Sequence, residues 1–184
     1  MIGLGLDTAK NRTGWAFIEN MNILEYGHIE CPKDLAKIKV DDAEFSKVLM
    51  WYYDQIKLLF QIHIPNIIVM ERLNLEYNRS AKTMIQFQTV VRLVSIREFF
   101  KNVYTIHNKT VKSAFKLNTP KNKIPISYIQ KARDLKIAKP HKLMMVDKIN
   151  EIFDTCLSYD QDDEADAIAL VWAQMKGMAN GKIK

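Results

Sequence analysis

Acidic side chains follow two apolar runs that are far apart in the sequence. Asp7 comes directly after residues 2–6, and Glu71 comes directly after residues 67–70. Each run predicts a buried strand. An acid inside a sheet would be costly to desolvate, whereas an acid at the end of a strand can reach a cleft while its backbone stays rigid. The pattern therefore predicts two carboxylates at the ends of two central strands.

A third group of acids opens a predicted helix further along the chain. Residues three apart on a helix share one face, with Cβ atoms roughly 5–6 Å apart, so Asp163 and Asp166 are expected to point the same way. If the register of the helix differs, Asp162 takes the place of Asp163 and still shares a face with Asp166. Small side chains in the same segment would let the helix lie close against a sheet and press its acids toward the strand ends: Ala165, Ala167 and Ala169.

Each acid also has an ordinary structural explanation when it is taken singly. Asp7 can be a turn residue that accepts bonds from nearby N–H groups, and Glu71 can belong to an ion pair. Asp163 and Asp166 can be charges that the dipole of the helix favours in its first turn. Gathered in one place, however, the four carboxylates would repel one another and raise at least one pKa, unless a cation lies between them.

Carboxylate oxygens without nearby His or Cys suit hard cations, so we expect Mg²⁺ at this site, with Mn²⁺ as a substitute. Two such ions about 3.5–4 Å apart can hold a phosphodiester, where one activates the attacking water and the other stabilises the leaving oxygen. No nucleophile from the protein is then required. The candidate catalytic and metal-binding residues are therefore Asp7, Glu71, Asp163 and Asp166.

The elements that must position these acids follow from the hydrophobic pattern. Strands are predicted at residues 2–6, 14–18, 23–29, 67–70 and 103–106. Helices are predicted at residues 40–62, 80–100, 110–115, 141–153 and 162–178, and residues 118–137 are expected to form a loop with a short helix. This order favours an α/β fold, with a mixed five-stranded sheet flanked by helices in one domain over residues 1–184.

Charge is distributed unevenly along a chain whose formal net charge is +6. Residues 109–142 hold ten Lys or Arg against one acid, whereas residues 160–166 hold five acids and no base. A basic segment followed by an acidic one suits a surface that binds phosphates beside a site that holds cations. The alternative is two solvated surface stretches of opposite sign.

Location is suggested by what the sequence lacks. The first residues show no basic segment or cleavage site typical of an export signal, and the apolar runs are too short to cross a membrane. The two cysteines, Cys31 and Cys156, look like thiols in a reducing compartment. We therefore expect a cytoplasmic protein without a membrane partner.

Taken together, these motifs resemble those of RuvC-type Holliday junction resolvases. Gly5-Leu6-Asp7 followed by Thr13-Gly14-Trp15 resembles the first motif of the family. Residues 67–71 resemble its second acidic strand, and residues 163–169 resemble its last motif, in which two acids three apart precede small and apolar residues. The resemblance implies a ribonuclease H-like fold, a homodimer, Mg²⁺ dependence and cleavage of two strands of a four-way DNA junction.

The same resemblance implies roles for individual residues. The four acids would be the metal ligands, and Lys112 and Lys142 would approach the phosphates. Lys116 and Lys139 of the same basic span are further candidates for DNA binding. Tyr77 is a candidate for the aromatic residue that disturbs base stacking at the junction, or it is an ordinary surface tyrosine.

Three departures from the family pattern point to a divergent member, from a phage or a mobile element, acting in a bacterial or phage-infected host cytoplasm. Thr8-Ala9-Lys10 replaces the usual proline-glycine, residues 89–91 lack the family's glycines near the dimer contact, and residues 118–140 form a longer segment. Two alternatives stay open: a ribonuclease H-like nuclease that acts on RNA or on branched DNA more broadly, and a non-catalytic junction-binding protein. An ATPase of the sugar-kinase or actin type is disfavoured, because it needs two such domains and a later glycine-rich loop.

Overall fold

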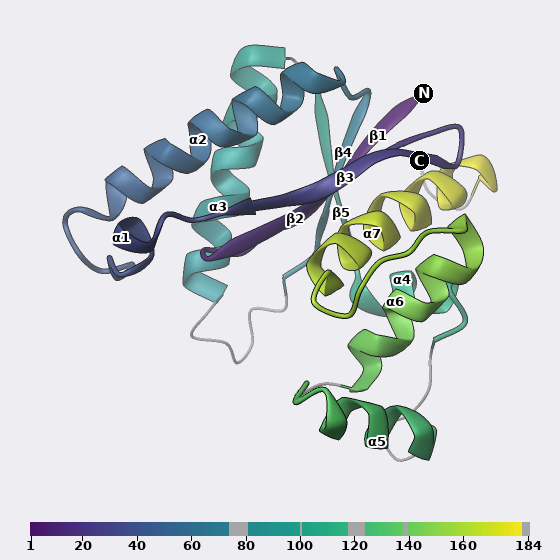
Figure 1. The fold of residues 1–184 in the computed structure, drawn as a ribbon. Coiled ribbons are helices and arrows are strands. Elements are labelled where there is room, and N and C mark those ends of the chain that lie inside the picture. The colour runs from purple at the N-terminus through teal and green to yellow at the C-terminus, as the bar shows by residue number, and fades with distance from the viewer. Residues whose placement is uncertain (74–80, 100, 118–123, 138–139, 182–184) are drawn as a thin grey trace.

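The computed structural model describes residues 1–73, 81–99, 101–117, 124–137 and 140–181. One sheet holds the strands of these described residues in the order β3-β2-β1-β4-β5 (Figure 1). Strand β1 pairs antiparallel with β2 and parallel with β4, so the sheet is mixed, as predicted. The strands are β1 (Ile2–Asp7), β2 (Arg12–Glu19), β3 (Asn22–Glu30), β4 (Ile67–Glu71) and β5 (Asn102–Ile106).

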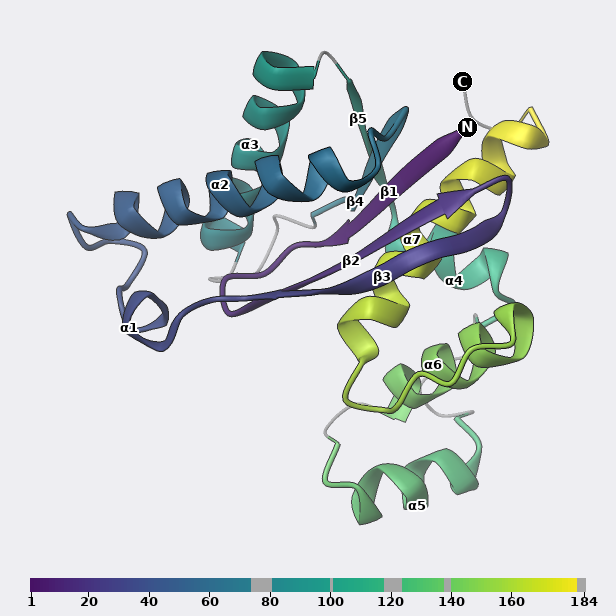
Figure 2. The same cartoon turned by 45° about the horizontal axis from the view of Figure 1, so that its top comes forward.

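Helices cover both faces of this sheet. Helices α2 and α3 lie on one face, and α7 lies on the other with α4 and α6 beside it (Figures 1 and 2). No helix of the described ranges is long and apolar enough to cross a membrane. The helices are α1 (Lys33–Ala36), α2 (Phe45–Ile62), α3 (Ala81–Val94), the π-helix η1 (Ser95–Phe99), α4 (Asn108–Ala114), α5 (Ile126–Asp134), α6 (Pro140–Phe153) and α7 (Asp162–Ala179).

Strands β1 and β4 are buried on both faces, which explains their unbroken apolar sequences. Successive side chains of a strand point to opposite faces of the sheet. In β1, Leu4 and Leu6 pack under α2 and α3, whereas Gly5 lies against α7. Because Asp7 and Glu71 continue the α7-facing positions of β1 and β4, both acids belong to the face that α7 covers.

Two boundaries differ from the sequence prediction for local reasons. Helix α2 begins at Phe45 rather than at residue 40, because the Asp42 side chain accepts a hydrogen bond from Lys39 N at 2.7 Å and holds a turn there. Helix α3 continues as a π-helix from Ser95, whose hydroxyl donates to Val91 O at 2.7 Å. The short helix expected within residues 118–137 is α5.

Candidate functional site

The register of the sheet brings Asp7 and Glu71 to neighbouring positions. Strands β1 and β4 run parallel, and Leu6 of β1 pairs with Met70 of β4. Asp7 and Glu71 are the next residues of these strands and also their last residues. The two carboxylates therefore stand at the same end of the sheet, on its α7 face.

Helix α7 reaches this end of the sheet because two glycines allow its backbone to touch the strands. A Cβ atom added to Gly5 would lie 2.1 Å from Ala167 O, and one added to Gly14 would lie 2.1 Å from Asp163 O. Gly14 pairs with Asp7 across β1 and β2. The first turn of α7, which carries Asp163, is thereby held above the strand position beside Asp7.

Burial and mutual repulsion act on the acids that meet here. Burial raises the pKa of Asp7 well above its ordinary value of 3.8, and the charges of Asp166, Asp163 and Glu71 raise it further, against an opposing effect of Lys142. Burial also raises the pKa of Asp166 to about 6; Lys142 opposes this shift, and Glu71 and Asp163 add to it. The charges of Glu71 and Asp163 thus act on both Asp7 and Asp166, although these acids come from β1, β4 and α7.

The register of α7 separates the roles of its first two acids. Asp163 contributes to the raised pKa of Asp7, whereas Asp162 forms an ion pair with Lys142. The backbone of Asp163 also lies against Gly14, the strand residue that pairs with Asp7, so Asp163 with Asp166 stays the candidate pair.

Side chains of the protein already contact some of the candidate ligands. Asn108 Nδ2 donates to Glu71 Oε1 at 3.0 Å, and Lys142 Nζ lies 3.7 Å from Asp163 Oδ1. Within the described ranges, no three acids, histidines or cysteines are arranged closely enough to hold a metal ion as they stand. The donor chemistry nevertheless fits a hard divalent cation, because every candidate ligand is a carboxylate and a nearby positive charge would relieve the raised pKa values.

Two of the predicted DNA-binding lysines lie near the acids. Lys112 in α4 and Lys142 in α6 both lower the pKa of Asp166 through their charge. Lys116 is exposed just beyond the end of α4. The last two candidates lie outside the described residues, so their roles stay predictions: Lys139 and Tyr77.

An ion cluster around the buried Glu164, next to the candidate acids, was not predicted from the sequence. Arg12 Nη2 donates to both carboxylate oxygens of Glu164 at 2.9 Å, and His28 Nδ1 lies 2.9 Å from Glu164 Oε1. The signal that could have found it is a glutamate inside the otherwise apolar stretch at the start of α7.

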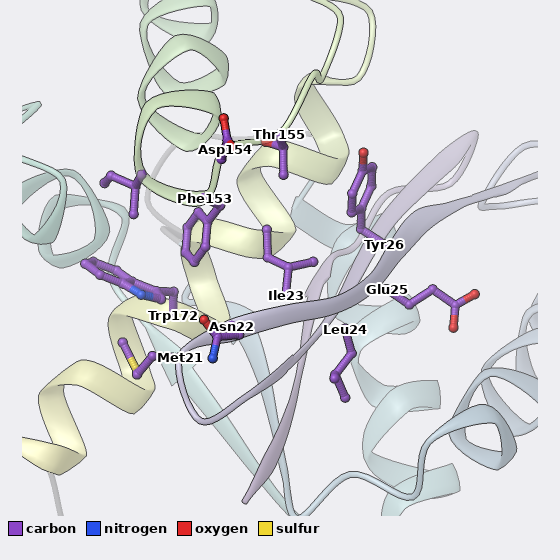
Figure 3. A pocket seen from close by; sticks show the side chains of 11 residues that line it. Met21, Asn22, Ile23, Leu24, Glu25, Tyr26, Phe153, Asp154, Thr155 and Trp172 are labelled. Atoms are coloured by element: carbon purple, nitrogen blue, oxygen red, sulfur yellow. The ribbon is translucent and has the colours of Figure 1, made fainter.

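A cleft of about 730 Å³ opens elsewhere, between β3 and the end of α6. Figure 3 shows Ile23, Tyr26, Phe153 and Trp172 around it, with Leu24 directed away. It lies by the Asn22 end of β3, whereas Asp7 stands at the opposite end of the sheet. The acids therefore do not line this cleft.

Comparison with known proteins identifies the fold. No protein-family model matches the sequence, and no curated protein matches it. RuvC of Thermus thermophilus in complex with a Holliday junction substrate is similar in structure, with a TM-score of 0.66 and 14% identity over 100% of this chain and 98% of that chain. Yeast mitochondrial Holliday junction resolvase gives a TM-score of 0.57 and 16% identity over 96% of this chain and 78% of that chain. The chain therefore has the ribonuclease H-like fold of these resolvases, as predicted.

Proposed function

We propose that the chain is a RuvC-type resolvase, a nuclease that cuts four-way DNA junctions by metal-dependent hydrolysis of phosphodiesters. The observation that carries the proposal is geometric: Asp7 and Glu71 end neighbouring parallel strands, and the backbone of Asp163 at the start of α7 lies against Gly14, which pairs with Asp7. The fold supports it, because one structural neighbour is a resolvase in complex with its Holliday junction substrate. We propose further that residues 1–184 act as one nuclease domain in the cytoplasm.

The four carboxylates would hold Mg²⁺, or Mn²⁺ in its place, and we propose two ions. Such ions supply an activated water and stabilise the charge on the leaving oxygen. The protein's part is to fix the ligands. Asp7 and Glu71 are anchored by neighbouring strands, and Asp163 and Asp166 are anchored by a helix that two glycines seat on those strands. Asn108 orients Glu71 through its hydrogen bond to Oε1.

Lys112 is proposed to bind a DNA phosphate beside the acids. Lys112→Ala should therefore weaken junction binding to a similar extent for different base sequences, and it should reduce the slope of log affinity against log salt by about 1. The measurement is a salt titration of junction binding in EDTA, which prevents cleavage. Lys47→Ala is the matched control, because it removes the same charge from α2 on the other face. Equal salt slopes for Lys112→Ala and the wild type would contradict the assignment.

A homodimer is proposed because two opposed strands of a junction require two active sites, which a two-fold dimer supplies. An apolar row on the outer side of α3 and η1 offers a contact surface. Ile85, Leu93 and Ile96 are 43%, 53% and 64% exposed, and exposed apolar side chains gathered on one part of a surface are typical of an interface.

Leu93→Glu should convert the dimer into a monomer, because it places a charge inside the proposed contact. Light scattering coupled to gel filtration gives the mass of each variant. Leu58→Glu is the control, since Leu58 on α2 is similarly exposed, at 57%, but lies outside the row. A wild type that runs as a monomer at all concentrations, or a Leu93→Glu variant that stays dimeric, would contradict this surface.

A panel of nucleic acids tests the proposed substrate. The protein is incubated in Mg²⁺ with a four-way junction, a three-way junction, a linear duplex and an RNA–DNA hybrid of related sequence. We expect cleavage of the four-way junction and an intact linear duplex. Equal cleavage of the linear duplex would refute junction selectivity and leave a general nuclease, and cleavage of the hybrid alone would favour the ribonuclease alternative. Tight junction binding without any cleavage would favour the non-catalytic alternative.

A further inference from the structure

Glu164 is a carboxylate buried beside the candidate metal ligands. Its side chain is 1% exposed. Arg12 Nη2 donates to both of its oxygens at 2.9 Å, and His28 Nδ1 lies 2.9 Å from one of them. A carboxylate at this depth destabilises a fold unless such partners neutralise it. The Glu164 side chain is therefore bound to β2 through Arg12 and to β3 through His28.

The Arg12 guanidinium also contacts the chain at two places around the start of α7: just before the helix and in its first turn. Arg12 Nη1 donates to Asp160 O at 2.8 Å, just before the helix begins. Arg12 Nε makes no hydrogen bond to any residue that the structure describes, but it lies 3.7 Å from Asp163 Oδ2. Because a guanidinium is a rigid plate with nitrogens at fixed angles, these contacts fix the helix entry relative to β2.

Two independent contacts thus define the placement of the first turn of α7. Gly14 sets how closely the backbone at Asp163 approaches the sheet. Arg12, which begins the same strand, binds the side chain of the neighbouring Glu164, and a side-chain contact of this kind restrains the rotation of a turn about the helix axis. Rotation decides where Asp163 and Asp166 point, because both lie on one face of the helix.

We propose that Arg12 is a positioning residue for the metal ligands: with Glu164 and His28, it orients the first turn of α7 so that Asp163 and Asp166 face Asp7 and Glu71. This inference rests on the proposed metal-binding role of those acids. Side chains that orient metal ligands typically contribute about 10–100-fold to metal affinity.

The competing explanation is that the ion cluster only stabilises the fold. Replacing both members of a buried ion pair with apolar residues of similar size is often neutral or favourable for stability. The double variant Arg12→Met/Glu164→Leu therefore separates the two explanations, because it can fold without the orienting contacts. Lys57→Met/Glu98→Leu is the matched control, since Lys57 Nζ and Glu98 Oε2 form a 3.0 Å ion pair on the opposite face of the sheet.

Mn²⁺ binding without DNA, followed by electron paramagnetic resonance well below the Tm of each variant, tests the proposal. We expect Arg12→Met/Glu164→Leu to require roughly 10–100 times more Mn²⁺ for half-saturation, and Lys57→Met/Glu98→Leu to bind like the wild type. If the first double variant does not fold, Arg12→Lys serves in its place, since lysine keeps the positive charge and lacks the planar set of donors of a guanidinium. Weaker Mn²⁺ binding is again expected.

Wild-type Mn²⁺ affinity in a folded Arg12 variant would overturn the positioning role. So would a wild-type protein that binds no Mn²⁺. Because binding is measured without DNA, a wild type that binds Mn²⁺ and cuts no junction would refute the proposed function alone and leave the positioning role standing.

Discussion

Asp7→Asn should abolish junction cleavage while making the metal-free protein more stable. Cleavage should fall by about a thousandfold or more, because the charge stabilisation that a bound cation supplies amounts to several kcal/mol. Stability should rise because burial and three neighbouring acids raise the pKa of Asp7, so its ionised form opposes folding at neutral pH. A gain on the order of 1 kcal/mol is typical when a strained functional group is removed, which corresponds to about 2–4 °C in Tm for a chain of this size.

The pH dependence of the metal-free protein should show the same repulsion. The pKa of Asp166 is raised from 3.8 to about 6 in the folded protein. Between these values the folded state binds more protons than the unfolded state, so the free energy of unfolding should fall as pH rises from about 4 to about 6. Saturating Mg²⁺ at neutral pH should raise the stability of the wild type, because the proposed ions would bind only the folded state.

Thermal unfolding in EDTA, with and without added Mg²⁺, measures both effects. Asp54→Asn is the control, because Asp54 is an exposed acid on α2, on the far face of the sheet. Its Tm and activity should match those of the wild type. An Asp7→Asn variant that is less stable than the wild type in EDTA would contradict the repulsive cluster.

Gly14→Ala should destabilise the protein and disable the site together. The new Cβ would lie 2.1 Å from Asp163 O, so helix α7 has to move away from β2. Overpacking typically costs about 1–3 kcal/mol, and we expect the upper end, because the obstacle is backbone rather than a movable side chain. A ligand displaced by about 1 Å can lower the rate about a hundredfold, so cleavage should fall at least that far at temperatures where the variant is folded.

Gly27→Ala is the control for Gly14→Ala. It also adds a methyl group at a crowded strand glycine, but this methyl group would meet Trp15 instead of the backbone of α7. Its Cβ would lie 2.7 Å from the ring of Trp15, a side chain that is only partly buried and can shift. We expect a smaller loss of Tm and near-normal cleavage. A folded Gly14→Ala variant with wild-type activity would show that the seating of α7 on β2 does not position Asp163.

Local signals made much of this fold predictable. The apolar runs before Asp7 and Glu71 mark strands because both faces of the sheet are covered, and each strand ends at its acid. Residues 162–178 are predicted to form a helix because their acids and alanines have helical spacing and lead into a long apolar stretch. The start of α2 was predicted five residues too early, because the side-chain bond of Asp42 competes with the helix there.

Contacts between distant residues could not be predicted in the same way. Arg12 and Glu164 are 152 residues apart, and hydrophobic periodicity carries no information about such a pair. The roles of Gly5 and Gly14 depend on carbonyls of a helix that reaches them only in the folded chain. The acids could therefore be predicted as candidates, whereas the contacts that we propose to orient them required the structure.

Paired nicking of a mobile four-way junction tests the central claim most directly. The wild type is incubated with the junction in Mg²⁺ or in EDTA, and Asp7→Asn is treated in the same way, with each strand labelled in turn. We predict nicks at symmetric positions in two opposed strands in Mg²⁺, and none in EDTA or with Asp7→Asn. Nicking that persists in EDTA or in Asp7→Asn, or no cleavage of any nucleic acid with Mg²⁺ or Mn²⁺, would contradict a metal-dependent nuclease built on these four acids.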